Sequence, residues 1–269
     1  MANQCGVLGK PIAHSLSPAM HRAAYAQLGL DWTYDAYEVA ESELEDFLNS
    51  RDESWRGLSL TMPLKRVVIG LADEVTTVAG ALGVANTVEF RDGSIIVSNT
   101  DCAGALAALA ERGVRKTKTA RILGAGATAT SFAYALASRG VGHIEFVVRN
   151  PDTVTDAVAV AEKAGAEVVV RRIDKPLIDV VDLLVSTVPA DAVRKGVHEF
   201  VESAHAVFDA IYDPWPTPLA KAADEADVPF VSGLDLLAHQ AAFQIELMTG
   251  SPIDVDILRD AALAELASR

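Results

Sequence analysis

Short apolar runs alternate with amphipathic segments through the first hundred residues of the chain. Residues 6–9 have the pattern of a strand end. Ser17-Pro18 after them is typical of a helix start, with the serine as N-cap and the proline at the first helical position. Gly29 is placed to stop that helix near residue 28. The same pattern predicts strands at residues 33–39 and 57–60, a short acidic helix opened by a capping box at 42–45, and a helix over 63–70.

Residues 84–90 and 94–98 are predicted to pair as antiparallel strands, because Asp92-Gly93 between them is a strong hairpin signal. A basic, helix-breaking stretch at residues 112–118 indicates a domain transition, although a solvated loop explains it equally well. Strand and helix then alternate strictly, which predicts a doubly wound parallel sheet. Its strands are expected at residues 120–123, 143–148, 167–170, 182–185, 206–209 and 229–231, and two amphipathic helices follow at 235–249 and 255–268.

Composition excludes several classes of protein. The chain has 269 residues, half of them apolar, with 23 basic and 37 acidic side chains and a formal net charge of −14. That charge disfavours binding to nucleic acid or to an anionic membrane surface. Cys5 and Cys102 are too few for a disulfide framework or a four-thiolate metal site. With no apolar leader in the first six residues and no apolar run near 20 residues, we expect a cytoplasmic, soluble protein.

A glycine-rich turn carries the clearest chemistry. Residues 121–129 end a strand and open a helix with the pattern G-x-G-x-x-A. Gly124 permits the tight turn, Gly126 lets the backbone approach a pyrophosphate, and Ala129 keeps helix and strand close. In this context the pattern predicts a dinucleotide site.

The residue that ends the next strand indicates which dinucleotide binds. NAD-binding proteins place an acid there, whereas this chain has Arg149, whose guanidinium suits a ribose phosphate. NADP is therefore favoured. A solvated arginine is the alternative, and NAD stays open because Asp152 lies close by and no second basic residue follows.

Four short segments are dense in polar groups and fall at the ends of predicted strands. Their hydroxyls, amides, ammonium and carboxylate suit a small polyhydroxylated acid and proton transfer at a carbonyl. Each also has an ordinary structural interpretation: Ser17 as a helix cap, Lys65 as a solvated helix residue, Asn86 as a turn former and Asp101 as a cap. The segments are residues 15–18, 61–65, 85–87 and 99–104.

The order of these segments resembles the shikimate dehydrogenase family along almost the whole chain. The shared motifs are the serine pair at S-P-x-x-H, T-x-P-x-K, A-N-T, N-T-D-x-x-G, the glycine-rich turn, residues 209–212 with Pro214 and Thr217, and residues 233–237 with Gln240. This resemblance implies reversible NADP-dependent reduction of 3-dehydroshikimate to shikimate, a step in aromatic amino acid biosynthesis. A homodimer is one candidate assembly for the chain.

The resemblance also assigns roles to individual residues. Lys65 and Asp101 are the implied catalytic pair. The implied substrate contacts are Ser15, Ser17, Thr61, Lys65, Asn86, Asp101, Tyr212 and Gln240. The implied cofactor contacts are Gly124, Ala125, Gly126, Ala127, Thr128, Ala129, Arg149, Thr187, Ile211, Gly233 and Leu236. No metal is implied, since the six histidines lack ligand spacing.

The expected fold is α/β with two domains and a cleft between them. An N-terminal α/β substrate domain with a mixed sheet is expected over residues 1–102, completed by helices at 236–269. A Rossmann-type NADP domain with a doubly wound parallel sheet is expected over residues 103–235.

Departures from the family pattern leave alternatives open. Ser59 and Arg22 each replace a usual asparagine, and Val148 and Thr153 stand where the cofactor segment commonly has an asparagine and a second basic residue. An NAD-dependent quinate/shikimate dehydrogenase is therefore the nearest alternative. A catalytically silent ligand-binding relative is another, which the retained Lys65 and Asp101 disfavour.

Overall fold

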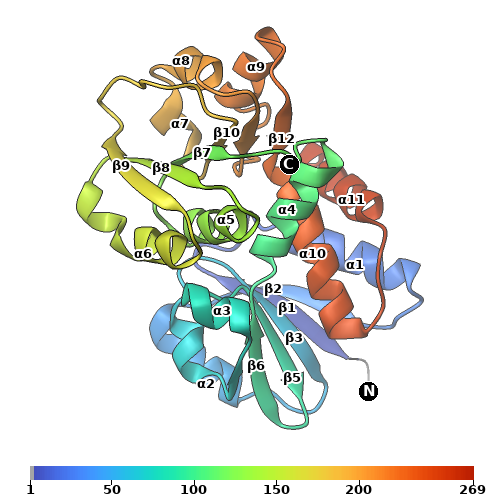
Figure 1. The fold of residues 1–269 in the computed structure, drawn as a ribbon. Helices are drawn as coiled ribbons and strands as arrows, with labels where there is room; N and C mark the ends of the chain where they lie inside the picture. Colours follow the sequence, from blue (N-terminus) through green and yellow to red (C-terminus); the bar gives the residue numbers. More distant parts are fainter. Residues whose placement is uncertain (1–2) are drawn as a thin grey trace. The chain divides into compact units, whose positions relative to one another are not determined.

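The computed structural model describes residues 3–269 (Figure 1). Met1 and Ala2, part of the stretch expected to lack a leader, lie outside the described residues. The chain forms two compact units: residues up to Gly104 together with Ala238–Arg269, and Ala105–Leu237. The two boundaries fall inside helices, α4 (Asp101–Glu111) and α10 (Gly233–Thr249).

The first unit contains a six-stranded mixed sheet with the order β2-β1-β3-β5-β6-β4. Its β1, β2 and β3 are parallel, whereas β5 runs antiparallel to both β3 and β6. The predicted hairpin is confirmed, since Asp92 and Gly93 both have positive φ, 52° and 80°. The strands are β1 Gln4–Gly9, β2 Thr33–Glu38, β3 Trp55–Leu60, β4 Glu74–Val75, β5 Thr87–Arg91 and β6 Ser94–Ser98.

Helices cover this sheet and supply its apolar partners. Figure 1 shows α10 and α11, from the end of the sequence, close to α1 from its beginning, and α1 contacts α11 directly. One buried cluster centres on Leu8, Leu58 and Val88. The helices are α1 Ser17–Gln27, α2 Leu44–Asn49, α3 Thr77–Leu82 and α11 Val255–Ala267, with 3-10 turns at Glu41–Glu43 and Val67–Leu71.

The second unit is the predicted doubly wound parallel sheet, with the order β12-β11-β10-β7-β8-β9. From β7 the chain adds β8 and β9 on one side, and it then crosses back to add β10, β11 and β12 on the other side. The topology therefore switches between β7 and β10. The strands are β7 Thr119–Leu123, β8 His143–Val148, β9 Glu167–Arg172, β10 Leu183–Ser186, β11 Val207–Asp209 and β12 Phe230–Ser232. The helices are α5 Ala127–Ser138, α6 Thr155–Lys163, α7 Ala190–Val193, α8 Val197–Glu202 and α9 Pro218–Glu225, with a 3-10 turn at Pro151–Thr153.

Three local predictions are wrong. Ser17 is the first residue of α1, with Leu16 in the cap position and no side-chain cap. The capping box expected at residues 42–45 instead begins two residues earlier. It opens a 3-10 turn, where the backbone N–H of Ala40 donates to the Glu43 carboxylate at 2.7 Å. The segment after Pro63 makes turns before its 3-10 helix, because the Lys65 carbonyl accepts from the Ala85 N–H at 2.8 Å instead of from a helical partner.

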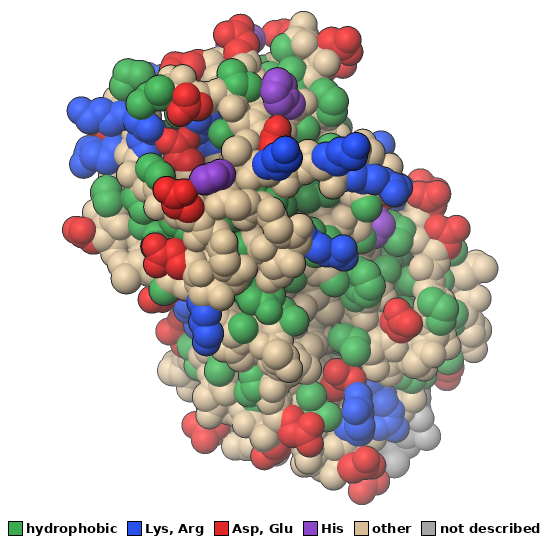
Figure 2. Space-filling view, in the orientation of Figure 1, with side chains coloured by type: hydrophobic (Ala, Val, Ile, Leu, Met, Phe, Trp, Pro, Cys, Tyr) green, Lys and Arg blue, Asp and Glu red, His purple; other side chains and the backbone are tan. Residues whose placement is uncertain are grey.

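Acidic side chains are spread over the visible face of the molecule, whereas lysine and arginine gather in a few places (Figure 2). Among residues 3–269, no helix is both long enough and apolar enough to cross a bilayer.

Candidate active site

Lys65 and Asp101 form an ion pair in the first unit. Lys65 lies in the turn after β3, and Asp101 is the first residue of α4. The Lys65 Nζ donates to the Asp101 Oδ2 at 2.6 Å, and the side chains are only 15% and 9% exposed. A charge-assisted hydrogen bond with so little water around it is strong and holds both groups in place.

Two amides complete this cluster. The Asn86 Nδ2, just before β5, lies 2.8 Å from the Asp101 Oδ1 and 3.1 Å from the Gln240 Oε1. Gln240 belongs to α10, so a side chain from late in the sequence reaches a strand end of the first sheet. The structure thus brings together four predicted site residues, Lys65, Asn86, Asp101 and Gln240.

The other predicted substrate residues of this unit lie apart from the ion pair. Thr61 directly follows β3, and Ser15 and Ser17 stand at the start of α1, where the Ser15 Oγ accepts from the Ser17 N–H at 3.3 Å. Within residues 3–269, none of these three side chains hydrogen-bonds to Lys65 or Asp101. They stay predicted substrate contacts.

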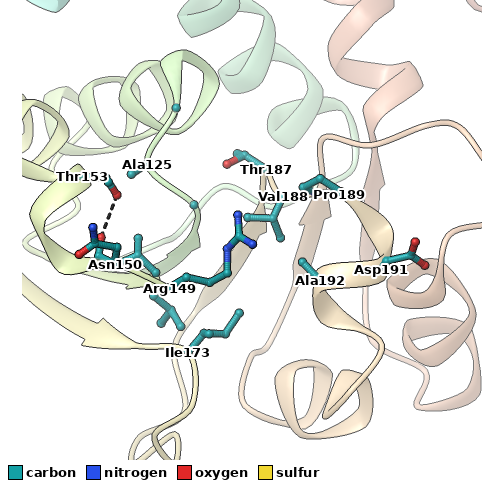
Figure 3. A pocket seen from close by; sticks show the side chains of 14 residues that line it. Ala125, Arg149, Asn150, Thr153, Ile173, Thr187, Val188, Pro189, Asp191 and Ala192 are labelled. Carbon is teal, nitrogen blue, oxygen red and sulfur yellow. Dashed lines mark hydrogen bonds between the residues drawn. The ribbon is translucent and has the colours of Figure 1, made fainter.

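A cavity of about 770 Å³ lies in the second unit at the carboxyl ends of β7, β8 and β10 (Figure 3). Its position at the switch point is where doubly wound sheets bind ligands. It is lined by Gly124, Ala125, Gly126, Val147, Val148, Arg149, Asn150, Thr153, Ile173, Thr187, Val188, Pro189, Asp191 and Ala192.

The two glycines of this cavity differ: space and conformation both require Gly124, whereas Gly126 leaves its backbone open. Gly124 has a φ of +106°, and a Cβ there would lie 2.5 Å from the Thr187 Oγ1. Gly126 caps α5, and a Cβ there would meet nothing within 4 Å, so its backbone faces open space. Ala127 and Thr128 continue into the first turn of α5, and Ala129 is fully buried against the sheet.

Arg149 extends among the lining residues, with Thr187 and Val188 near its guanidinium in Figure 3. It is the single cation among the described lining residues. Thr153 uses its hydroxyl locally, donating to the Asn150 carbonyl at 2.8 Å.

Seven predicted residues of the second unit do not line this cavity: Ala127, Thr128 and Ala129 in α5, and four residues later in the chain. Ile211 and Tyr212 follow β11, Gly233 opens α10, and Leu236 is buried in the unit's main core. Gly233 packs tightly against the preceding segment, since a Cβ there would lie 2.4 Å from the Ala210 carbonyl oxygen.

Asp209, at the end of β11, is almost fully buried and holds the segment that carries these residues. Its Oδ1 accepts from the Ile211 N–H at 3.2 Å. Burial raises the pKa of Asp209 to about 6, although hydrogen bonds from the Thr217 hydroxyl and the Ile211 N–H act in the opposite direction.

Behind the ion pair lies a layer of buried polar residues to which sequence reasoning gave no role, namely Ser59, Thr87, Thr100 and Gln244. Gln244 alone was not singled out, although it follows Gln240 by four residues and so shares its face of α10.

Comparison with known proteins gives consistent matches. Residues 7–88 match the shikimate dehydrogenase substrate binding domain, and residues 233–263 match the shikimate 5'-dehydrogenase C-terminal domain. The chain is 36% identical to a shikimate dehydrogenase (NADP(+)) of Methanopyrus kandleri, over 98% of this chain and 96% of the relative.

Solved structures agree with these sequence matches. The crystal structure of the Mycobacterium tuberculosis shikimate dehydrogenase is 38% identical with a TM-score of 0.88, covering 97% of this chain and 99% of that one. The Thermus thermophilus enzyme in complex with NADP(H) and shikimate is 31% identical with a TM-score of 0.83, covering 97% and 99%.

Proposed function

The chain belongs to the shikimate dehydrogenase family, and we propose that Lys65 and Asp101 are the catalytic pair with which it interconverts 3-dehydroshikimate and shikimate, using NADP. The observation that carries this assignment is the 2.6 Å ion pair, together with the Asn86 and Gln240 amides beside it. Neutral amides and charged groups in one cluster suit the hydroxyls of a small polar ring.

Lys65 handles the proton of the reaction. Reduction of a ketone develops negative charge on the oxygen, and the Lys65 ammonium stabilises that charge and donates the proton. In the opposite direction, the neutral amine accepts the proton from the hydroxyl group. An ammonium has three N–H donors, so it can bond to Asp101 and still present a proton to the ligand. Asp101 fixes the direction in which Lys65 points.

The cavity of the second unit fits a phosphorylated dinucleotide. The glycine turn leaves room for a pyrophosphate at the N-terminus of α5, and Arg149 would hold the 2′-phosphate. Ala125 and Thr187 would form further walls of the site, and Ile211, Tyr212, Gly233 and Leu236 would act from the segments after β11 and β12. NADPH, when bound, supplies the hydride to the carbonyl carbon.

We place this activity in the cytoplasm, because both cysteines are buried free thiols and fit a reducing compartment. A homodimer is the assembly that we propose to test, by sedimentation equilibrium.

Initial rates with shikimate or quinate, each with NADP or NAD, test the proposed function. We expect the highest kcat/KM with shikimate and NADP. A higher value with quinate and NAD would replace this assignment by the quinate/shikimate dehydrogenase alternative. Binding of both ligands with no turnover would instead identify a silent ligand-binding relative.

A further inference from the structure

A chain of buried hydrogen bonds leads from Tyr34 to the ion pair. The Tyr34 hydroxyl donates to the Ser59 Oγ at 2.5 Å, and the Ser59 hydroxyl donates to the Gln244 Oε1 at 2.8 Å. The Gln244 Nε2 then donates to the Thr87 Oγ1 and to the Asn86 carbonyl, both at 3.0 Å. All five residues are at most 5% exposed, so water does not compete for these bonds.

The last links reach Asp101 through the Asn86 side chain. The Thr87 hydroxyl donates to the Asn86 Oδ1 at 2.9 Å, and the Asn86 Nδ2 donates to the Asp101 Oδ1 at 2.8 Å. Asp101 therefore receives one N–H from Asn86 and one from Lys65, on different oxygens.

Two backbone groups determine the direction of every bond in the chain. The Asn86 carbonyl can only accept, so the Gln244 atom beside it must be nitrogen. The Thr100 N–H can only donate, so the Asn86 atom 2.8 Å from it must be oxygen. With both amides oriented, each hydroxyl hydrogen has a single acceptor. Thr87 donates to the Asn86 Oδ1, Ser59 to the Gln244 Oε1, and Tyr34 to the Ser59 Oγ.

We propose that Gln244 is a positioning residue for the reaction: through Thr87 and the Asn86 backbone it keeps the Asn86 N–H pointed at Asp101. This proposal rests on the proposed role of the Lys65–Asp101 pair. The Asn86 N–H and the Lys65 ammonium bond to different oxygens of Asp101, so together they fix how the carboxylate is turned toward Lys65. Ser59, where the family pattern has asparagine, supplies the donor that occupies the Gln244 oxygen.

The far end of the chain favours an orienting role over proton conduction. Tyr34 stacks on His21 with ring centroids 3.9 Å apart, and both side chains are fully buried. Burial lowers the pKa of His21 to about 3 and raises that of Tyr34, so neither group changes charge at neutral pH. A chain whose aromatic neighbours both stay neutral holds its protons in place.

The test compares Gln244→Met, which keeps the length but removes the oxygen and the nitrogen of the side-chain amide, with Thr87→Val and Thr87→Ser. Thr249→Val is the matched control, because it removes a hydroxyl from the same helix that bonds only to nearby backbone. We expect kcat with shikimate to fall about tenfold or more in Gln244→Met and Thr87→Val, while Thr87→Ser and Thr249→Val stay within about twofold of wild type.

Two further readouts separate positioning from a general loss of structure. The KM for shikimate should change much less than kcat in Gln244→Met, since Gln244 does not touch the ligand and only the orientation of Asp101 is disturbed. The double variant Gln244→Met/Thr87→Val should be no slower than the worse single variant, because the two residues act as one unit.

A kcat near wild type in Gln244→Met would overturn the proposal, and so would a Thr87→Ser variant as slow as Thr87→Val. If Gln244→Met does not fold, the Thr87 pair decides the question. A wild-type protein inactive on shikimate would overturn the proposed function instead. The Asn86–Asp101 distance in a crystal structure of Gln244→Met would then decide the inference, with retention of the contact counting against it.

Discussion

At the scale of single residues, the site depends on three charged side chains, Lys65, Asp101 and Arg149, each with few oppositely charged neighbours. Lys65 and Asp101 neutralise one another in a poorly hydrated place, where loss of either leaves an uncompensated charge. Arg149 is the single cation among the described residues of its cavity. Each of these side chains therefore has an effect that can be measured separately.

Replacing Lys65 by alanine should lower kcat by roughly 10²- to 10⁴-fold, because the proton donor and the positive charge are both lost. The KM for shikimate should change much less, since Asn86 and Gln240 stay in place. Steady-state rates with saturating NADP measure both constants. Lys10→Ala is a suitable control, because Lys10 pairs with Glu38 at 3.9 Å on the exposed surface. Near-normal turnover of Lys65→Ala would contradict the role of Lys65.

Replacing Arg149 by alanine should reduce kcat/KM for NADP by roughly 10- to 100-fold, the effect of losing a charged hydrogen bond to phosphate. The value for NAD, which lacks that phosphate, should stay within about twofold. Arg139→Ala, at the exposed end of α5, serves as the control. Equal losses with both cofactors would show that Arg149 does not bind the 2′-phosphate.

At the scale of elements, sequence patterns predicted what local chemistry controls. Asp92-Gly93 determined the hairpin, and the alternation after residue 119 predicted every strand of the parallel sheet to within two residues at each end. The α-helix expected after Pro63 does not form, because the Lys65 carbonyl accepts a hydrogen bond from the backbone N–H of Ala85, 20 residues away. Gln244 was missed for the same reason: its partners Ser59 and Thr87 are distant in sequence, and periodicity contains no information about them.

The contact between α4 and α10 predicts the effect of Gly104→Ala. Alanine normally favours a helix by up to about 1 kcal/mol over glycine. Here its Cβ would lie 2.9 Å from the backbone nitrogen of Gln240, so α10 must shift. We expect a net loss of roughly 1–3 kcal/mol in the free energy of unfolding, together with a higher KM for shikimate as Gln240 moves.

Gly80→Ala is the matched control in α3, where the new Cβ would meet its nearest atom at 3.6 Å. Urea unfolding should show Gly80→Ala to be equal to or more stable than wild type. If Gly104→Ala were as stable as Gly80→Ala, the two helices would not be in the tight contact described.

The end of β11 predicts a pH dependence of stability. The pKa of Asp209 is about 6 in the folded chain, against about 3.9 when unfolded, so the folded state binds this proton more tightly. The stability it contributes is present below pH 4 and is lost as the pH rises to about 6. Relative to Asp209→Asn, wild type should lose up to about 3 kcal/mol over that interval. Urea unfolding of both proteins from pH 4 to 7 measures this difference, and a constant difference would contradict the shift.

At the scale of the whole molecule, the charge of −14 opposes the approach of an anionic ligand. The acidic side chains, which Figure 2 shows spread over the visible face, act at long range. Arg149 and the N-terminus of α5 act on a ligand in the cavity within a few ångströms. The two effects therefore respond differently to salt.

Raising the ionic strength from about 0.01 M to 0.1 M shortens the screening length from about 30 Å to about 10 Å. That change removes long-range repulsion first, so kcat/KM for NADP should rise severalfold over this interval. Repeating the titration with a second chloride salt controls for specific ion effects. A steady fall with salt would show that attraction already dominates at long range.

The division of the first unit between two stretches of sequence has a consequence for synthesis. The second unit, Ala105–Leu237, is continuous and is translated in full before Gln240 and Gln244, so it emerges from the ribosome ahead of them. Domains generally fold as units while the chain is being made, so the nucleotide-binding half is complete first. The residues up to Gly104 must wait, with the places for α10 and α11 unfilled. The half that was translated first is therefore expected to mature last, with apolar surface of its sheet exposed in the interval.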